Sequence, residues 1–148
     1  MRFKCLHYSV TESSGYVDIC VQKVQPNEAF SFGVRTVGDT AKEGSEYERM
    51  DKIIAFSKTE NEKTVPIKIF DNNEWQPDLV FHVELYSPAD SDMIAYDEYD
   101  TKCKVTILDE DFPGTLGFEE TSVLVSKSAK FVDLNVVRTD GSDGKIAC

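Results

Sequence analysis

The chain has 148 residues, 41% of them hydrophobic, and a formal net charge of −11 from 27 acidic and 16 basic residues. Its length fits one domain, or one domain followed by part of another. The acidity argues against nucleic acid and anionic membrane surfaces as partners, because both would repel the chain, and it favours cations. The same acidity would also serve a β-rich protein that only needs to stay soluble. The sequence contains no run of about 18 apolar residues, so we expect no insertion into a membrane.

Hydrophobic residues alternate with polar ones at a period of two along most of the chain, which is the pattern of half-buried β-strands. In chain order, strands are expected at residues 8–10, 17–21, 30–34, 53–56, 65–69, 79–85 and 103–107. Pro66 lies inside one of them and indicates an edge position or a bulge. Short strands separated by turn-prone residues predict an all-β fold, an antiparallel seven-stranded β-sandwich of immunoglobulin-like type.

The sequence also contains an internal repeat. Residues 15–21 (Gly-Tyr-Val-Asp-Ile-Cys-Val) resemble residues 130–136 (Lys-Phe-Val-Asp-Leu-Asn-Val) at an offset of one sandwich domain. We therefore expect a first domain over residues 1–112 and the first strands of a second copy over 113–148. The strands of this second copy are expected around 117–118, 122–125 and 131–138. Such a fragment would leave an open edge, so it would have to pair with the first domain, another chain or further residues.

Carboxylates follow every second strand. If the strands alternate in direction, the first, third, fifth and seventh end at one pole of the sandwich, and the segments that follow them are all acidic. These segments are 11–15, 37–52, 71–78 and 109–111. The loop of residues 87–100 at the opposite pole is acidic as well, through Asp90, Asp92, Asp97, Glu98 and Asp100, so the asymmetry is incomplete.

Carboxylates that converge on one pole repel one another. Two unit charges about 4 Å apart cost about 4 kcal/mol at an effective dielectric constant of about 20. A hard cation relieves this repulsion, and Ca²⁺ accepts about six to eight oxygen ligands in irregular geometry, whereas Mg²⁺ requires a stricter octahedron. The pattern favours Ca²⁺, although four separately solvated acidic turns would produce the same sequence. An EF-hand is excluded, because its D-x-[DN]-x-[DN]-G run is absent from the sequence.

Four stretches, in order, resemble the Calx-beta family, and in particular the tandem regulatory calcium-binding domains of sodium/calcium exchangers. They are Thr11-Glu-Ser-Ser-Gly, Val34-Arg-Thr-Val-Gly-Asp-Thr-Ala-Lys-Glu-Gly-Ser-Glu-Tyr-Glu, Phe70-Asp-Asn-Asn-Glu-Trp-Gln-Pro-Asp and Thr106-Ile-Leu-Asp-Glu-Asp-Phe-Pro-Gly. The resemblance covers nearly the whole chain. It implies a set of oxygen ligands for Ca²⁺, namely Glu12, Glu46, Asp71, Asn72, Glu74, Asp109, Glu110 and Asp111.

Some of these positions depart from the family pattern. Glu46 replaces the usual aspartate, and Asn72 and Gln76 stand where acids are usual, which implies fewer ions or weaker binding. Glu74 or Asp78 would compensate. In the second repeat, Lys127 stands where the first has Glu12, so we expect no metal there.

The resemblance implies a calcium-sensing regulatory domain of a sodium/calcium exchanger-type transporter, on the cytoplasmic side of the membrane. Its partners would be Ca²⁺, a second Calx-beta domain and the membrane domain of the parent chain. The alternative is a Calx-beta repeat that serves as a structural module of an adhesion or extracellular-matrix protein outside the cell. In the exchanger reading, bound Ca²⁺ would pin residues 109–111, and Gly114 would be the hinge to the second repeat.

Catalysis is not expected. The sequence lacks G-x-S-x-G, P-loop and H-E-x-x-H motifs, and His7 and His82 lie inside predicted strands. We therefore predict no catalytic residues and no organic cofactor.

Overall fold

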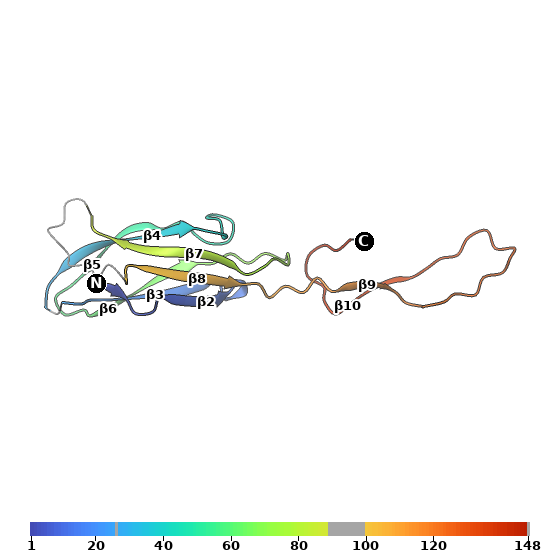
Figure 1. Ribbon diagram of the computed structural model, residues 1–148, viewed down its shortest axis with the longest axis horizontal. Helices are drawn as coiled ribbons and strands as arrows, with labels where there is room; N and C mark the ends of the chain where they lie inside the picture. The colour runs from blue at the N-terminus through green and yellow to red at the C-terminus, as the bar shows by residue number, and fades with distance from the viewer. Residues whose placement is uncertain (26, 89–99, 148) are drawn as a thin grey trace. The chain divides into compact units, whose positions relative to one another are not determined.

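The computed structural model describes residues 1–25, 27–88 and 100–147 (Figure 1). The chain divides into two compact units, one of Met1–Asn72 with Pro77–Asp109 and one of Asn73–Gln76 with Glu110–Cys148. The acidic residues Asp90, Asp92, Asp97 and Glu98 lie outside the described residues. The described residues include no helix that is long and apolar enough to cross a membrane.

The first unit is a β-sandwich, as the alternating pattern predicts. Its larger sheet has the strand order β2-β8-β7-β4-β5, and its smaller sheet the order β1-β3-β6. The predicted strand segments all find counterparts, and the two-residue β1 is additional. The bounds are β1 (Arg2–Phe3), β2 (His7–Thr11), β3 (Tyr16–Gln22), β4 (Phe30–Gly38), β5 (Asp51–Phe56), β6 (Glu62–Lys68), β7 (Leu79–Tyr86) and β8 (Lys102–Leu108).

The core lies between the two sheets. Alternate residues of the strands point inward and are buried, including Ile19 and Ile67 from the smaller sheet and Phe32, Phe81 and Val105 from the larger one. Burying each such side chain contributes roughly 1.5–3 kcal/mol. Pro66, expected at an edge or a bulge, lies in β6 at the edge of the smaller sheet, where its missing N–H costs no sheet hydrogen bond.

One strand pair departs from the antiparallel pattern. β2 pairs with β8 in parallel, from His7↔Lys104 to Thr11↔Leu108, whereas β8, β7, β4 and β5 pair antiparallel in turn. The first and last strands of an alternating series point the same way, so they must be parallel when they become neighbours. It follows that β2, β4 and β8 all end at the same pole of the sandwich.

The turns at this pole are tied together by backbone hydrogen bonds. Just beyond β6, Ile69 N donates to Gly15 O at 2.9 Å, and Phe70 N donates to Glu46 O at 2.9 Å. The loop after β4 is further anchored by Tyr47, which is fully buried and stacks on Phe81 with ring centroids 4.1 Å apart. Burial raises the pKa of Tyr47, and the neighbouring carboxylates of this loop add to the effect. The acidic loops at this pole are therefore held against the core.

The second unit contains an antiparallel hairpin of β9 (Thr115–Phe118) and β10 (Val136–Thr139). The strand expected at 122–125 does not form, and the one expected at 131–138 is paired only from Val136 onward. A strand needs a neighbour to satisfy its backbone, and β9 and β10 supply one only to each other. Several apolar side chains between them are exposed, among them Leu124 and Phe131.

Candidate metal centre

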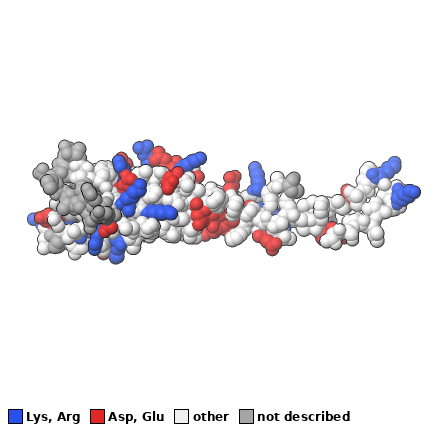
Figure 2. All heavy atoms as spheres, in the orientation of Figure 1, with Lys and Arg blue, Asp and Glu red and all other residues white. Residues whose placement is uncertain are grey.

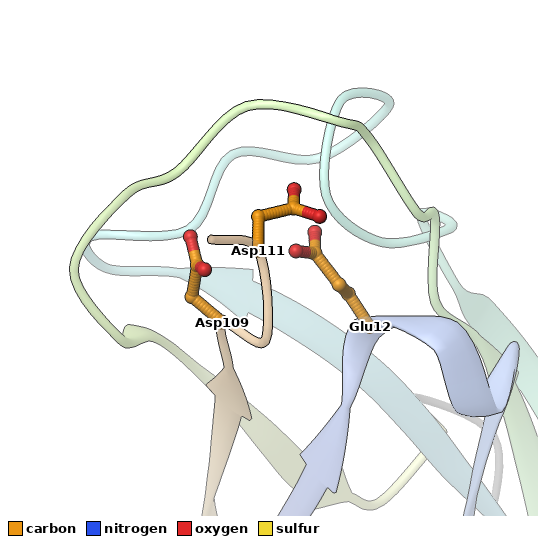
Figure 3. A group of neighbouring side chains, drawn as sticks. All are labelled: Glu12, Asp109 and Asp111. Carbon is orange, nitrogen blue, oxygen red and sulfur yellow. The ribbon is translucent and has the colours of Figure 1, made fainter. Parts of the chain in front are cut away.

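Three carboxylates meet at the pole where β2 and β8 end. Glu12, Asp109 and Asp111 each offer an oxygen, and these oxygens lie within 4.8 Å of one another (Figure 3). Glu12 is 1% exposed and Asp111 is 9% exposed, and Asp109 is half-buried. On the face drawn in Figure 2, acidic side chains gather where β8 ends.

The parallel pairing of β2 and β8 explains why these residues meet. The last residues in register are Thr11 and Leu108, so Glu12 and Asp109 are the next residues of two neighbouring strands that run in the same direction. Both side chains therefore leave the sheet at the same edge. Asp111 follows two residues after Asp109 and points back toward Glu12 (Figure 3).

A tight turn directs Glu12 into the molecule. Glu12 opens the 3₁₀ turn η1 (Glu12–Ser14), which ends at Gly15 with φ of 75°, a conformation that favours glycine. The N–H of Gly15 donates to Glu12 O at 3.3 Å, and the hydroxyls of Thr11 and Ser14 lie 2.8 Å apart. The turn thus holds the backbone of Glu12 while its side chain is buried.

Two neighbours support the group. Asn72 donates an N–H from Nδ2 to Glu12 Oε2 at 2.8 Å, so in this structure Asn72 orients Glu12 through its nitrogen. Asp78 Oδ1 accepts a hydrogen bond from Asp109 N at 3.3 Å. From the sequence, Asp78 is expected only as a substitute ligand, and its place in the acidic loop of residues 71–78 is the signal that indicates it.

The structure does not bring the other predicted ligands into this group. Glu46 accepts a hydrogen bond from Lys42 N at 2.6 Å through Oε2, which closes its own turn. Asp71, Glu74 and Glu110 have exposed side chains on the same set of loops. Their role as ligands stays a prediction.

The donor set suits a hard cation. Among the described residues this group consists of carboxylates alone, and oxygen ligands suit Ca²⁺ or Mg²⁺, whereas Zn²⁺ and Cu²⁺ sites are usually built with histidine or cysteine. The two largely buried carboxylates lose part of their hydration, and their charges repel across a medium less polar than water. A divalent cation would offset both costs, so the residues present fit Ca²⁺.

Comparison with known sequences places this geometry in context. The model of the Calx-beta domain family matches residues 1–111 and again residues 109–147. Sodium/calcium exchanger 2 of Homo sapiens is 30% identical over 153 residues, which cover 94% of this chain. Sodium/calcium exchanger Calx of Drosophila melanogaster is 24% identical over 147 residues, which cover 99% of this chain. The chain spans only 17% and 15% of the lengths of these two relatives.

Solved structures show the same fold. The crystal structure of the apo-form Calx CBD1 domain matches with a TM-score of 0.65 at 23% identity, over 74% of this chain and 96% of that one. The crystal structure of calcium binding domain CBD12 of CALX1.1 matches with a TM-score of 0.67 at 24% identity, over 94% of this chain and 56% of that one. The strand order, the two family matches and these shared folds agree with the resemblance seen in the sequence, and the chain belongs to the Calx-beta domain family.

Proposed function

We propose that this chain is a calcium-binding regulatory domain of a sodium/calcium exchanger-type transporter. The observation that carries the proposal is the group of Glu12, Asp109 and Asp111, three carboxylates that β2 and β8 bring together at one pole. The exchangers among its relatives support the transporter context, and the CBD12 structure is described as a calcium binding domain. Its role would be to bind and sense Ca²⁺ and to catalyse no reaction.

The ligands would divide into two groups. Glu12, Asp109 and Asp111 would form the centre, because their oxygens already converge and their backbones are held by strands or by a tight turn. Carboxylates on the surrounding loops would complete the oxygen shell. These outer candidates are Glu46, Asp71, Glu74 and Glu110, with the side-chain oxygen of Asn72.

The proposal extends to the organisation of the parent protein. Residues 1–112 would form one Calx-beta domain and residues 113–148 the beginning of a second, which agrees with the two ranges that the family model matches. The second domain and the transporter's membrane domain would be the partners, and both Calx-beta domains would lie on the cytoplasmic side. The adhesion-module alternative is less favoured, because the relatives compared above are exchangers.

The proposal is tested by thermal unfolding of this chain in chelator, in millimolar Ca²⁺ and in millimolar Mg²⁺, with calorimetric titration of both ions. A ligand that binds only the folded state stabilises it by about 2.7 kcal/mol at about a hundredfold excess over Kd. We expect a rise in Tm of several degrees with Ca²⁺ and a smaller one with Mg²⁺. Identical melts in chelator and Ca²⁺, without heat on titration, would overturn the proposed function.

A further inference from the structure

Both histidines of the chain lie in one row of side chains across the larger sheet. His82 on β7 is paired with Lys104 on β8, and Lys104 is paired in turn with His7 on β2. Cys103 and Val105, on either side of Lys104, are buried in the core. Because side chains alternate between the two faces of a strand, Lys104 and the two histidines beside it lie on the outer face of the sheet.

These three basic side chains lack partners within the described part of the chain. No side-chain hydrogen bond or ion pair joins His7, His82 or Lys104 to another described residue. Like charges that face each other on neighbouring strands are unfavourable. The row therefore repels itself whenever the histidines are protonated, and an anion placed over it would relieve this repulsion.

The surrounding charges do not neutralise the row. Glu84 lies two residues after His82 on the same face, but its carboxylate already pairs with Arg35 at 2.8 Å and with Lys102 at 3.4 Å. The hydrogen bonds from Arg35 lower the pKa of Glu84. Burial and Lys102 lower the pKa of His82, whereas Asp39 and Glu84 act in the opposite direction. An anion that contacts the His82 imidazole would favour its charged form.

The next row along the same strands adds two hydroxyl groups. Thr106 on β8 is paired with Ser9 on β2, and both lie on the same face as Lys104. Neighbouring strands are about 4.8 Å apart, so His7 and His82 flank Lys104 across about 10 Å. Hydrogen bonds from charged donors to an anion are about 2.8 Å long. One tetrahedral anion over Lys104 can therefore meet donors on both sides.

We propose that this row binds the phosphate group of a small soluble ligand, with Lys104 at the centre and one imidazole on each side. Lysine supplies a compact charge with three donors, and imidazole donates an N–H even when it is neutral. Such donors suit the several oxygens of a phosphate. Carboxylates are preferentially bound by the guanidinium fork, and the fork of Arg35 already donates twice to Glu84.

The charge of the rest of the chain limits the size of the ligand. A net charge of −11 repels extended anions such as nucleic acids and anionic membranes. Charges more than about 8 Å apart are largely screened at physiological ionic strength. A single phosphate over the row is therefore influenced mainly by the three basic side chains beneath it, whereas a polymer or a vesicle also meets the acidic surface.

Imidazole NMR signals of the full chain, titrated with inorganic phosphate, test the inference. The chain has only two histidines, so each signal reports on one side of the proposed site. The titration is made in calcium-free buffer, and the result is therefore independent of the proposed calcium function. We expect the signals of His7 and His82 to move together with one Kd, and to stay in place when potassium chloride is added to the same ionic strength.

Four variants locate the site. Lys104→Gln should weaken phosphate binding about tenfold, as for the loss of one hydrogen bond to a charged group. His7→Gln and His82→Gln should each weaken it about threefold, because each removes one of the two flanking donors. Lys52→Gln is the matched control, since it removes an exposed cation from β5 of the same sheet, and it should leave the Kd unchanged.

Three results would overturn the inference. Equal shifts with potassium chloride would show a general effect of salt. A Lys104→Gln protein that binds phosphate like the wild type would place the phosphate elsewhere. Sedimentation with phosphatidylserine vesicles that Lys104→Gln abolishes would assign the row to lipid headgroups and contradict a small soluble ligand. A chain that binds phosphate as expected but no Ca²⁺ would support this inference while the proposed function fails.

Discussion

At the scale of single residues, Glu12 has the most unusual environment of the described carboxylates. It is almost fully buried, it lies next to Asp109 and Asp111, and it accepts a hydrogen bond from Asn72. A buried negative charge beside two others is unfavourable unless a cation is near. We therefore expect the negative charge of Glu12 to lower the free energy of unfolding in the absence of metal and to contribute to Ca²⁺ binding.

Glu12→Gln tests this trade-off, because glutamine keeps the shape and the acceptor oxygen and removes the charge. In chelator we expect the variant to be more stable than the wild type by about 1–3 kcal/mol, because residue 12 no longer carries a charge that is repelled by Asp109 and Asp111 at close range. In Ca²⁺ it should gain little or no further stability. Urea unfolding in both conditions measures the two effects.

Glu48→Gln is the matched control, since Glu48 is exposed and outside the carboxylate group. It should behave as the wild type in both conditions. A Glu12→Gln protein that is less stable in chelator, or that keeps the full stabilisation by Ca²⁺, would contradict the role assigned to Glu12.

The sequence predicts the positions of some candidate ligands better than those of others. Glu12 and Asp109 come directly after strands, so strand order and direction decide where they lie, and alternation along the chain reveals both. Glu46 and Glu74 lie deeper in loops, where local turns decide the direction of a side chain. The hydrogen bond from Lys42 N to Glu46 is such a local event, and no spacing in the sequence indicates it.

At the scale of elements, one contact joins three strands of the larger sheet on its outer face. Tyr86 on β7 lies over Gly33 on β4, and its hydroxyl donates to Asp51 on β5. Arg35 lies 5.5 Å from the Tyr86 ring centroid and pairs with Glu84 at 2.8 Å. An aromatic ring that covers a strand glycine compensates for the missing side chain.

Gly33→Ala should therefore destabilise the first unit. A Cβ at this position would lie 2.2 Å from Tyr86 Cζ, so the ring must move and give up its contacts with Asp51 and Arg35. We expect a loss of about 1–3 kcal/mol in the free energy of unfolding, as for overpacked sites. Urea denaturation at constant Ca²⁺ measures it.

Gly117→Ala provides the comparison, because a Cβ on Gly117 in β9 would meet no atom within 4 Å. Its effect on stability should stay within about 0.5 kcal/mol, as for an ordinary surface change. If Gly33→Ala lowered the free energy of unfolding as little as Gly117→Ala, the Tyr86 ring would not pack against Gly33 as described.

The strands also show where sequence patterns stop being informative. Alternation identifies a segment able to form a strand, and it succeeded for β2 to β8 because each found a neighbour in the sandwich. The same pattern at 122–125 produced no strand, because no partner strand is paired with it among the described residues. Similarly, alternation cannot reveal which strands become neighbours, so the parallel pair β2–β8 emerges only from the fold.

At the scale of the whole molecule, the two units differ in how completely they are packed. The first has a continuous core between two sheets, whereas the second exposes large apolar side chains such as Leu124, Phe131 and Phe118. Exposed apolar surface of this kind is typical of a face that becomes covered by further strands. The second unit nevertheless makes hydrogen bonds to the segment after Asp111, from Phe112 N to Asp143 Oδ2 and from Arg138 Nε to Pro113 O, and these bonds do not depend on a finished core.

The shortness of the connection should make the two units respond together to calcium. Asp109 N donates to Asp78 in the first unit and Phe112 N donates to Asp143 in the second. Glu110 and Asp111 lie between these two contacts along the chain, and Asp111 belongs to the proposed metal centre. Binding of Ca²⁺ would pin one of these two residues and leave about one residue's backbone freedom, worth about 1–2 kcal/mol of conformational entropy. We expect Ca²⁺ to reduce the relative motion of the two units markedly.

Residual dipolar couplings of the full chain, measured in chelator, in Ca²⁺ and in Mg²⁺, test this expectation. Separate alignment tensors for the two units should become more alike in magnitude when Ca²⁺ is added and change little with Mg²⁺, because units that move together share one alignment. Tensors that differ equally with and without Ca²⁺ in the wild type would mean that binding at Glu12, Asp109 and Asp111 is not transmitted through Glu110 and Asp111.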